Sequence, residues 1–231
     1  SLLLGGSKGT MTIDVPSGTG TEAWFKLNPD QTGFYRVNYP HEEWLRLASA
    51  VQRKQIAATD RLGLQSDAFA LSRAGLLPAT EFLELVMAYE GETSASVWAD
   101  LSSNLSSLDN LLEEQTFHPR FQKFARDLHQ DVGKRMGWEE RPGEPYLDIV
   151  LRSAVLSQLG SYRDQDTLDK GASQFAMFIE DAGSVRPDIR RVVYQLAAQT
   201  GGTKIYETMW TAFLKQTMQE ERGRLLRGLT S

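Results

Sequence analysis

The segment His41-Glu42-Glu43-Trp44-Leu45 is the nearest approach to a metal-binding motif in this sequence. A zinc-peptidase helix carries two histidines four residues apart, so that both imidazoles face one metal ion. Position 45 is leucine, so this chelate cannot form, and the two glutamates instead suit the positive N-terminal end of a helix. We expect His118 in a helix cap region and His129 on the surface, too far apart to share a metal ion. The histidines therefore predict no metal site.

The other motifs that carry chemistry are absent as well. The chain has no cysteine, which excludes disulfides, thiol nucleophiles and cysteine-bound metals. It contains no GxxxxGK[ST] phosphate loop. Neighbouring glutamates such as Glu113 and Glu114 point about 100° apart on a helix, so we interpret them as solvated surface and not as an acid–base pair. We expect no catalytic residue in this chain.

Basic side chains recur at Arg120, Lys123 and Arg126 along one predicted helix. Two interpretations stay open. The three residues form the wet face of an amphipathic helix, or they form a positive patch that binds a carboxylate, such as the C-terminus of a peptide.

Composition limits the partners and the compartment. The 231 residues carry a formal net charge of −5, which disfavours a nucleic-acid partner because phosphate contacts need surplus Lys and Arg. No apolar stretch approaches the ~18 residues of a membrane span, so we expect no membrane partner. The lack of cysteine is compatible with a reducing compartment, and we expect a cytoplasmic protein.

The chain changes character near residue 39. Alternating and β-rich runs predict strands at residues 11–15, 24–28 and 34–39, and we assign residues 1–39 to the C-terminal strands of a β-sandwich. From residue 40 the apolar period becomes helical and predicts ten helices. Local signals for helix ends are a cap at Thr59 or Asp60, an N1 proline at Pro187, and closing glycines at 75, 137, 160 and 183.

Helices joined by short loops pack antiparallel, and pairs of these helices recur about every 35–50 residues, within the loose range of HEAT-like repeats. We therefore expect a mainly α fold. Residues 40–231 would form an α-solenoid of HEAT-like antiparallel helix pairs, preceded by a small β-sandwich remnant. An irregular helical bundle is the alternative. The last helix runs to Ser231 without a polar-faced cap, so we expect the array to be truncated here.

Several blocks of residues resemble the M1 family of zinc aminopeptidases, and in particular its puromycin-sensitive-aminopeptidase-like branch. The larger blocks are Trp24-Phe25-Lys26-Leu27-Asn28, Gly33-Phe34-Tyr35-Arg36-Val37-Asn38-Tyr39 and Asp60-Arg61-Leu62-Gly63-Leu64-Gln65-Ser66-Asp67-Ala68-Phe69. The resemblance runs in order over residues 11–231. Such enzymes end in a β-sandwich and a helical domain of HEAT-like pairs. The resemblance implies that this chain corresponds to the end of the sandwich and the first part of the helical domain.

The resemblance implies a function without a catalytic residue. The family's HExxH metal helix and GxMEN substrate loop do not occur here, so we expect no cofactor in this chain and zinc only in the parent enzyme. The parent would remove N-terminal amino acids from peptides with a zinc-activated water. In this family the helical domain caps the active-site chamber and helps to bind peptides. The implied partners are the catalytic domain of the same polypeptide and peptide substrates.

We expect the motif residues to be structural. Arg36 would make a hydrogen-bonded pair, Asp60 would cap a helix, and Arg61 or Asp67 would tie the sandwich to the first helices. Trp98 would anchor helix packing. The alternative to an aminopeptidase domain is a free-standing helical scaffold that binds a peptide or protein partner.

Overall fold

The computed structural model describes residues 23–231, which fold into ten α-helices and two short 3-10 helices without a strand. The mainly α prediction is confirmed. None of the helices in this range is both long and apolar enough to cross a membrane. The helices are η2 (Pro29–Gln31), α1 (His41–Gln52), α2 (Ala58–Arg73), α3 (Ala79–Met87), α4 (Ala95–Leu112), α5 (His118–Met136), α6 (Tyr146–Ser161), α7 (Gln165–Glu180), η3 (Ala182–Ser184), α8 (Arg190–Thr200), α9 (Gly202–Lys215) and α10 (Gln219–Leu229).

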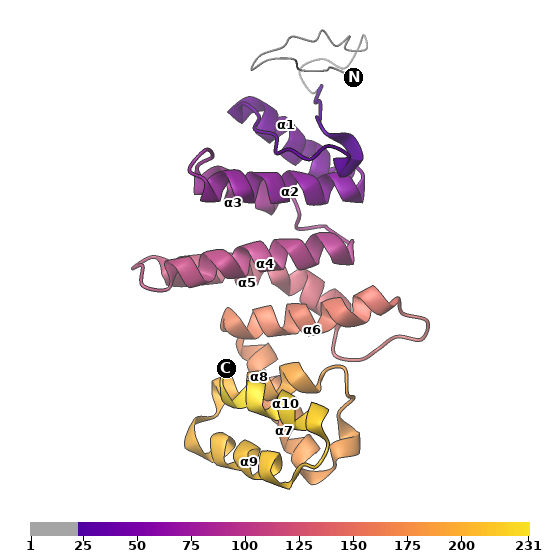
Figure 1. Ribbon diagram of the computed structural model, residues 1–231, viewed down its shortest axis with the longest axis vertical. Coiled ribbons are helices and arrows are strands. Elements are labelled where there is room, and N and C mark those ends of the chain that lie inside the picture. The colour runs from indigo at the N-terminus through magenta and orange to yellow at the C-terminus, as the bar shows by residue number, and fades with distance from the viewer. Residues whose placement is uncertain (1–22) are drawn as a thin grey trace.

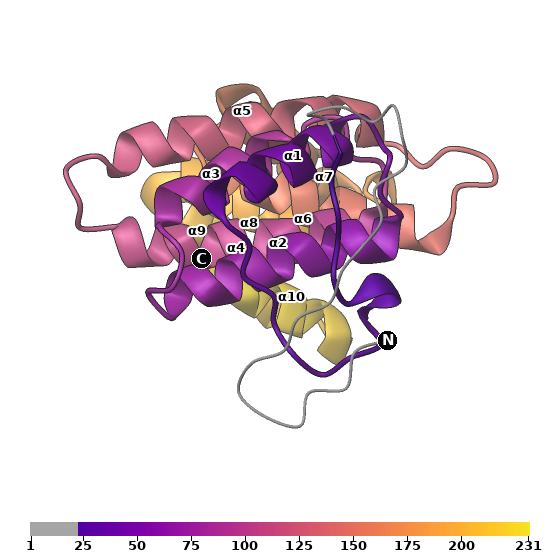
Figure 2. The ribbon, with the colours of Figure 1, turned by 90° about the horizontal axis from the view of Figure 1, so that it is seen from above.

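The helices form an elongated stack, with successive layers crossing its long axis (Figure 1). Along one row α2 contacts α4, α4 contacts α6, α6 contacts α8, and α8 contacts α10. The remaining helices pack beside this row, with α3 on α2, α5 on α4 and α6, α7 on α8, and α9 on α10. Seen from above, the layers lie one behind another (Figure 2). Each layer therefore covers the apolar face of the layer before it.

Two apolar cores run through the stack and meet at α6. The first core contains Trp98 and extends from α1 to α6. The second contains Phe175 and extends from α6 to α10. Val155 of α6 belongs to the first core and its neighbour Leu156 to the second. Adjacent helical residues point about 100° apart, so α6 presents apolar side chains to both neighbours.

Glycines close two helices where the sequence predicts it. Gly75 and Gly137 lie just beyond α2 and α5 with φ of 71° and 63°. This left-handed region suits glycine at a helix C-terminus. Gly160 was also predicted to end a helix, but it lies inside α6, where a Cβ would come within 2.1 Å of Leu196 Cδ2. A glycine is needed at this position because α8 packs closely against α6 there.

Two further predicted boundaries of α7 and α8 are displaced. Gly183 lies in η3, beyond the end of α7 at Glu180. Pro187 precedes the first residue of α8, Arg190, by a short turn and does not occupy the N1 position. Helix ends depend on tertiary contacts as well as on local residue types, so such shifts of a few residues are expected.

The predicted strands at residues 24–28 and 34–39 are wrong, because the chain there is irregular. Its backbone donors are used by side chains: Phe25 N donates to Glu43 Oε1 at 2.8 Å, and Leu27 N donates to Tyr39 Oη at 2.9 Å. A strand needs a row of backbone partners on a second strand, and no described segment supplies one. The predicted strand at 11–15 lies outside the described residues. The β-sandwich assigned to residues 1–39 thus has no strand within residues 23–39.

Candidate functional site

Residues at the start of α2 hold the segment that precedes α1. The Asp60 carboxylate accepts a hydrogen bond from Asp30 N at 2.9 Å and pairs with Lys26 Nζ at 2.8 Å. The prediction of Asp60 as a helix cap is wrong. It lies in the first turn of α2, behind the flanking residue Ala57, whose side chain makes no capping hydrogen bond. Its carboxylate binds the neighbouring segment instead.

Close packing fixes the same segment one turn further along α2. Asn28, Asp30 and Gln31 all have positive φ values, between 53° and 56°, which non-glycine residues seldom adopt. Gly63 of α2 makes room for this turn, since a Cβ there would lie 1.8 Å from Gln31 Nε2. Gly63, in the motif block 60–69, therefore makes room for the turn that precedes α1.

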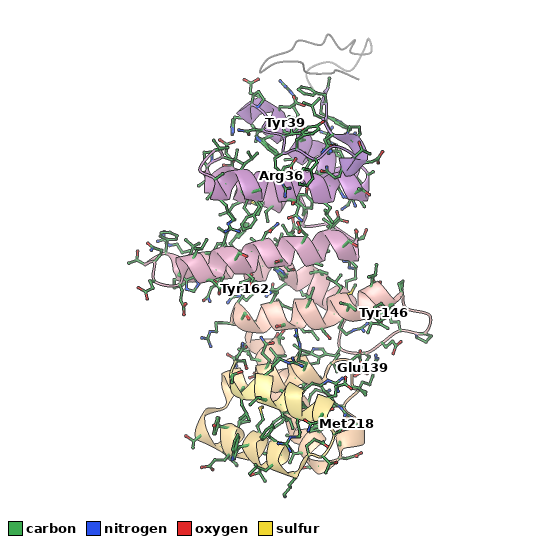
Figure 3. All side chains as sticks on the ribbon, viewed as in Figure 1. Arg36, Tyr39, Glu139, Tyr146, Tyr162 and Met218 are labelled. Atoms are coloured by element: carbon green, nitrogen blue, oxygen red, sulfur yellow. The ribbon has the colours of Figure 1, made fainter. Side chains whose placement is uncertain are left out.

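Arg36 lies against the middle of α2, near the α1–α3 end of the stack (Figure 3). Its Nη1 donates to Ser66 Oγ and to Asp67 Oδ1, both at 2.9 Å, and Val37 N donates to Asp67 Oδ2 at 3.2 Å. The Asp67 side chain is 4% exposed, whereas that of Arg36 is 54% exposed. The blocks 33–39 and 60–69 thus contact each other through a buried carboxylate.

Arg61 and Glu92 form a buried bidentate ion pair. Arg61 donates from Nε to Glu92 Oε2 at 2.6 Å and from Nη2 to Oε1 at 2.8 Å, while its Nη1 donates to Ile56 O at 2.6 Å. Thr93 N and Ser94 N also donate to Glu92 Oε1, each at 2.7 Å. Burial raises the pKa of Glu92, but the hydrogen bonds, first those from Arg61, outweigh it and lower the pKa to about 2. The pair joins α2 to the turn before α4.

Trp98 and His129 are fully buried in the first core, with their rings 5.3 Å apart. The prediction of a surface His129 is wrong, because it follows Ala125 by one helical turn and faces the same core. His129 Nδ1 lies 2.7 Å from Ala125 O and must donate to it, so Nε2 accepts from Ser102 Oγ at 2.9 Å. Burial lowers the pKa of His129 to about 4. The ring is thus a neutral part of the core.

The three basic residues of α5 have different surroundings. Arg120 and Lys123 are exposed. Arg126 is half-buried and donates from Nη1 to the carbonyl oxygens of Tyr162 at 3.1 Å and Arg163 at 3.4 Å. The last carbonyls of a helix lack partners within it, so Arg126 satisfies acceptors at the C-terminal end of α6.

A cavity of about 790 Å³ lies along the C-terminal ends of α4, α6 and α8. Figure 1 shows the α4–α5 loop and the C-terminal end of α6 on the same side of the stack. This volume lies within the range of small-molecule and peptide side-chain sites. Sequence reasoning missed the cavity, because its residues come from separate helices and share no spacing. The polar side chains that line it include Asp109, Glu113, His118, Gln122, Arg163 and Gln199.

Two carboxylates, those of Asp109 and Glu113, line this cavity beside amide, hydroxyl, imidazole and guanidinium groups. Asp109 Oδ1 lies 2.6 Å from His118 Nε2, and Glu113 is exposed at the end of α4. The side-chain oxygen of Gln199 is buried and accepts no hydrogen bond. The C-terminal ends of α4, α6 and α8 add partial negative charge, and the N-terminal end of α5 adds partial positive charge. Among the described residues that line the cavity, Arg163 alone carries a fixed positive charge.

No group of three or more histidine or acidic side chains is placed to hold a metal ion within the described part of the chain. The histidines are engaged separately: His41 lies 3.3 Å from Glu81, while His118 and His129 contact Asp109 and Ser102. The described residues therefore do not fit a zinc site, and no chemical step is assigned to a metal in this chain.

The sequence of this chain is similar to those of known proteins over nearly its whole length. Residues 24–231 match the family described as ERAP1-like C-terminal domain. Aminopeptidase M1-A from Oryza sativa subsp. japonica is 31% identical over 215 residues, which cover 90% of this chain and 24% of that protein. Glutamyl aminopeptidase from Sus scrofa is 30% identical over 230 residues, which cover 96% and 24%. This chain thus spans about a quarter of these relatives' length. The chain belongs to the ERAP1-like C-terminal domain family and is a C-terminal domain of the M1 aminopeptidase type.

Proposed function

We propose that this chain is the non-catalytic helical part of an M1 zinc aminopeptidase, where it caps the active-site chamber and helps to hold peptide substrates. The family match over residues 24–231 carries this proposal. In the parent enzyme a zinc-activated water would remove N-terminal amino acids from peptides. The partners would be the catalytic domain of the same polypeptide and the peptides themselves.

The architecture supports a capping role. The row α2, α4, α6, α8 and α10, in which each helix contacts the next, is the contact pattern of a stacked helical array. We propose that it is HEAT-like. Stacked arrays expose long surfaces suited to extended ligands. The cavity along the ends of α4, α6 and α8 gives such a surface a recess for part of a peptide.

Calorimetric titration of the 231-residue chain with an unblocked nonapeptide tests peptide binding. We expect a dissociation constant on the order of 100 µM, as for a weak single-site contact. The patch formed by Arg120, Lys123 and Arg126 stays a proposal for the peptide's C-terminal carboxylate. Reversing all three charges should then weaken binding. Arg126 also binds the carbonyl oxygens at the end of α6, so its replacement could disturb the fold. The double variant Arg120→Glu and Lys123→Glu is therefore measured separately, with Lys134→Glu on the same helix as a control.

Two results would contradict the proposal. The first is the absence of binding for every peptide tested. The second is catalysis by the chain itself: we expect no hydrolysis of aminoacyl-naphthylamides even with added zinc, and robust, chelator-sensitive turnover would show a catalytic site that we do not assign. A charge reversal that left binding unchanged would remove the basic patch from the account and leave the capping role intact.

The cytoplasmic location expected from composition stays a prediction. Cell fractionation followed by detection with a specific antibody tests it, and recovery in the soluble cytoplasmic fraction is the expected result.

A further inference from the structure

We propose that the cavity at the C-terminal ends of α4, α6 and α8 binds a positively charged peptide side chain, that of lysine or arginine. This inference rests on the proposed function, because it names the kind of peptide that the domain would hold. It assigns to the cavity a specificity that neither the fold nor the motif residues describe.

The charges around the cavity favour a cation. Asp109 and Glu113 supply two carboxylates, against the single guanidinium of Arg163. The last turns of α4, α6 and α8 contribute lining residues and bring partial negative charge, while the first turns of α5, through His118 and Gln122, bring partial positive charge. A cation placed among these groups is attracted by the two carboxylates and by three of the four helix ends.

The hydrogen-bond inventory points the same way. Gln199 lines the cavity, and its side-chain oxygen is buried and accepts no hydrogen bond from a described residue. Lysine and arginine side chains carry donors and no acceptor, so they suit a cavity that holds two carboxylates.

The carboxylate of Asp109 is oriented to accept a hydrogen bond from a ligand. One of its oxygens is held by His118 Nε2 at 2.6 Å, and its other oxygen makes no hydrogen bond with a described residue. The side chains of His118 and Asp109 are 14% and 16% exposed, so they are mostly sheltered from water. A carboxylate fixed in this way is oriented before a ligand arrives, which lowers the entropic cost of binding.

Fluorescence anisotropy with two labelled nonapeptides tests the charge preference. Both peptides carry a C-terminal amide and differ at one central position, which is lysine in one and glutamate in the other. The 231-residue chain should bind the lysine peptide about tenfold more tightly. Glu113→Gln should weaken binding of the lysine peptide about threefold, and Arg163→Gln should strengthen it. Glu114→Gln is the matched control, since Glu114 is exposed beside Glu113 and does not line the cavity.

The outcomes separate this inference from the proposed function. Equal affinity for the two peptides, or equal effects of Glu113→Gln and Glu114→Gln, would overturn the cation site while peptide binding by the domain stands. A preference for the glutamate peptide that Arg120→Glu and Lys123→Glu abolish would also overturn it, and would support the basic patch. If neither peptide binds, both proposals fail. Circular dichroism of each variant confirms that it is folded.

Discussion

Arg36 Nη1 lies 2.9 Å from Asp67 Oδ1, across 31 residues of sequence. The second carboxylate oxygen of Asp67 accepts from Val37 N at 3.2 Å, so one buried side chain holds both the Arg36 side chain and the adjacent backbone. This relationship explains why the two most distinctive motif blocks of the chain occur together. Residues 60–69 of α2 form the surface against which residues 33–39 pack.

Replacing Asp67 with asparagine should weaken the contact between residues 33–39 and α2. The variant loses a charge-assisted pair and keeps at most one acceptor, so we expect the free energy of unfolding to fall by about 2 kcal/mol. Asp127→Asn provides the control, because the Lys123–Asp127 pair is exposed and should contribute less than about 1 kcal/mol. Urea unfolding followed by circular dichroism measures both. Equal losses in the two variants would contradict the structural role of Asp67.

Glu92→Gln should be among the most destabilising single changes in the chain. It leaves the buried Arg61 guanidinium without its counter-charge, and breaking a buried pair in this way costs about 3–5 kcal/mol. Glu90→Gln, two residues earlier and exposed, should change stability by less than about 0.5 kcal/mol. Thermal unfolding of the two variants side by side gives the comparison. A Glu92 variant as stable as the Glu90 variant would show that the ion pair is dispensable.

The same carboxylate predicts a loss of stability in acid. The folded-state pKa of Glu92 is lowered from 4.5 to about 2, so its stabilisation is complete above pH 4.5 and disappears as the pH falls toward 2. The pKa of Glu144, which Arg152 lowers to about 2, adds a change in the same range. Glu92→Gln should therefore flatten, without abolishing, the decline measured by urea titrations from pH 5 to pH 2. An unchanged slope in this variant would be inconsistent with a lowered pKa.

His129 predicts a second acid-sensitive range at higher pH. Its pKa is lowered from 6.5 to about 4, so the folded state resists protonation that the unfolded chain accepts. The stabilisation is complete above pH 6.5 and is lost as the pH falls toward 4, by about 3 kcal/mol in total. His129→Gln should remove this slope, whereas the exposed His41→Gln should retain it. Unfolding titrations between pH 7 and pH 4 decide whether the two variants differ.

Two glycine substitutions should act in opposite directions. Gly171 of α7 packs against α8, where a Cβ would lie 2.4 Å from Leu196 Cβ, so Gly171→Ala should cost about 1–3 kcal/mol. A Cβ on Gly223 of α10 would meet nothing nearer than Arg227 Nη2 at 3.8 Å. Gly223→Ala should then stabilise by about 0.5–1 kcal/mol, because alanine favours the helix. Opposite shifts in the thermal midpoint are the expected result, and shifts of the same sign would contradict the packing described between α7 and α8.

The helices were predictable from sequence because burial on one face leaves a periodic apolar pattern. The stripe through Phe121, Ala125 and Val132 locates α5, and similar stripes locate the others. The strands were not, because residue types that favour a strand do not reveal whether a partner strand exists. In residues 24–39 Val37 and Tyr39 are buried in the first core, whereas Phe34 and Tyr35 are exposed. The backbone there bonds to the side chains of Glu43, Tyr39 and Asp67 instead.

The positions of polar side chains were harder to predict. His129 lies one helical turn from Ala125, and only the packing of α4 and α6 against α5 shows that this side of α5 is covered. Arg126 could be assigned to a helix surface, but its partners belong to the end of α6, 36 residues away. The cavity joins side chains of four helices, so its composition follows from the stacking and from no local motif.

Hydrogen–deuterium exchange of the 231-residue chain with and without the lysine nonapeptide tests most directly whether this domain holds peptides in the cavity. The account predicts slower amide exchange on peptide addition at the ends of α4, α6 and α8, around residues 109–113, 160–163 and 198–199, with little change in α1 and α3. Unchanged exchange at those three helix ends, or protection confined to α1 and α3, would contradict it.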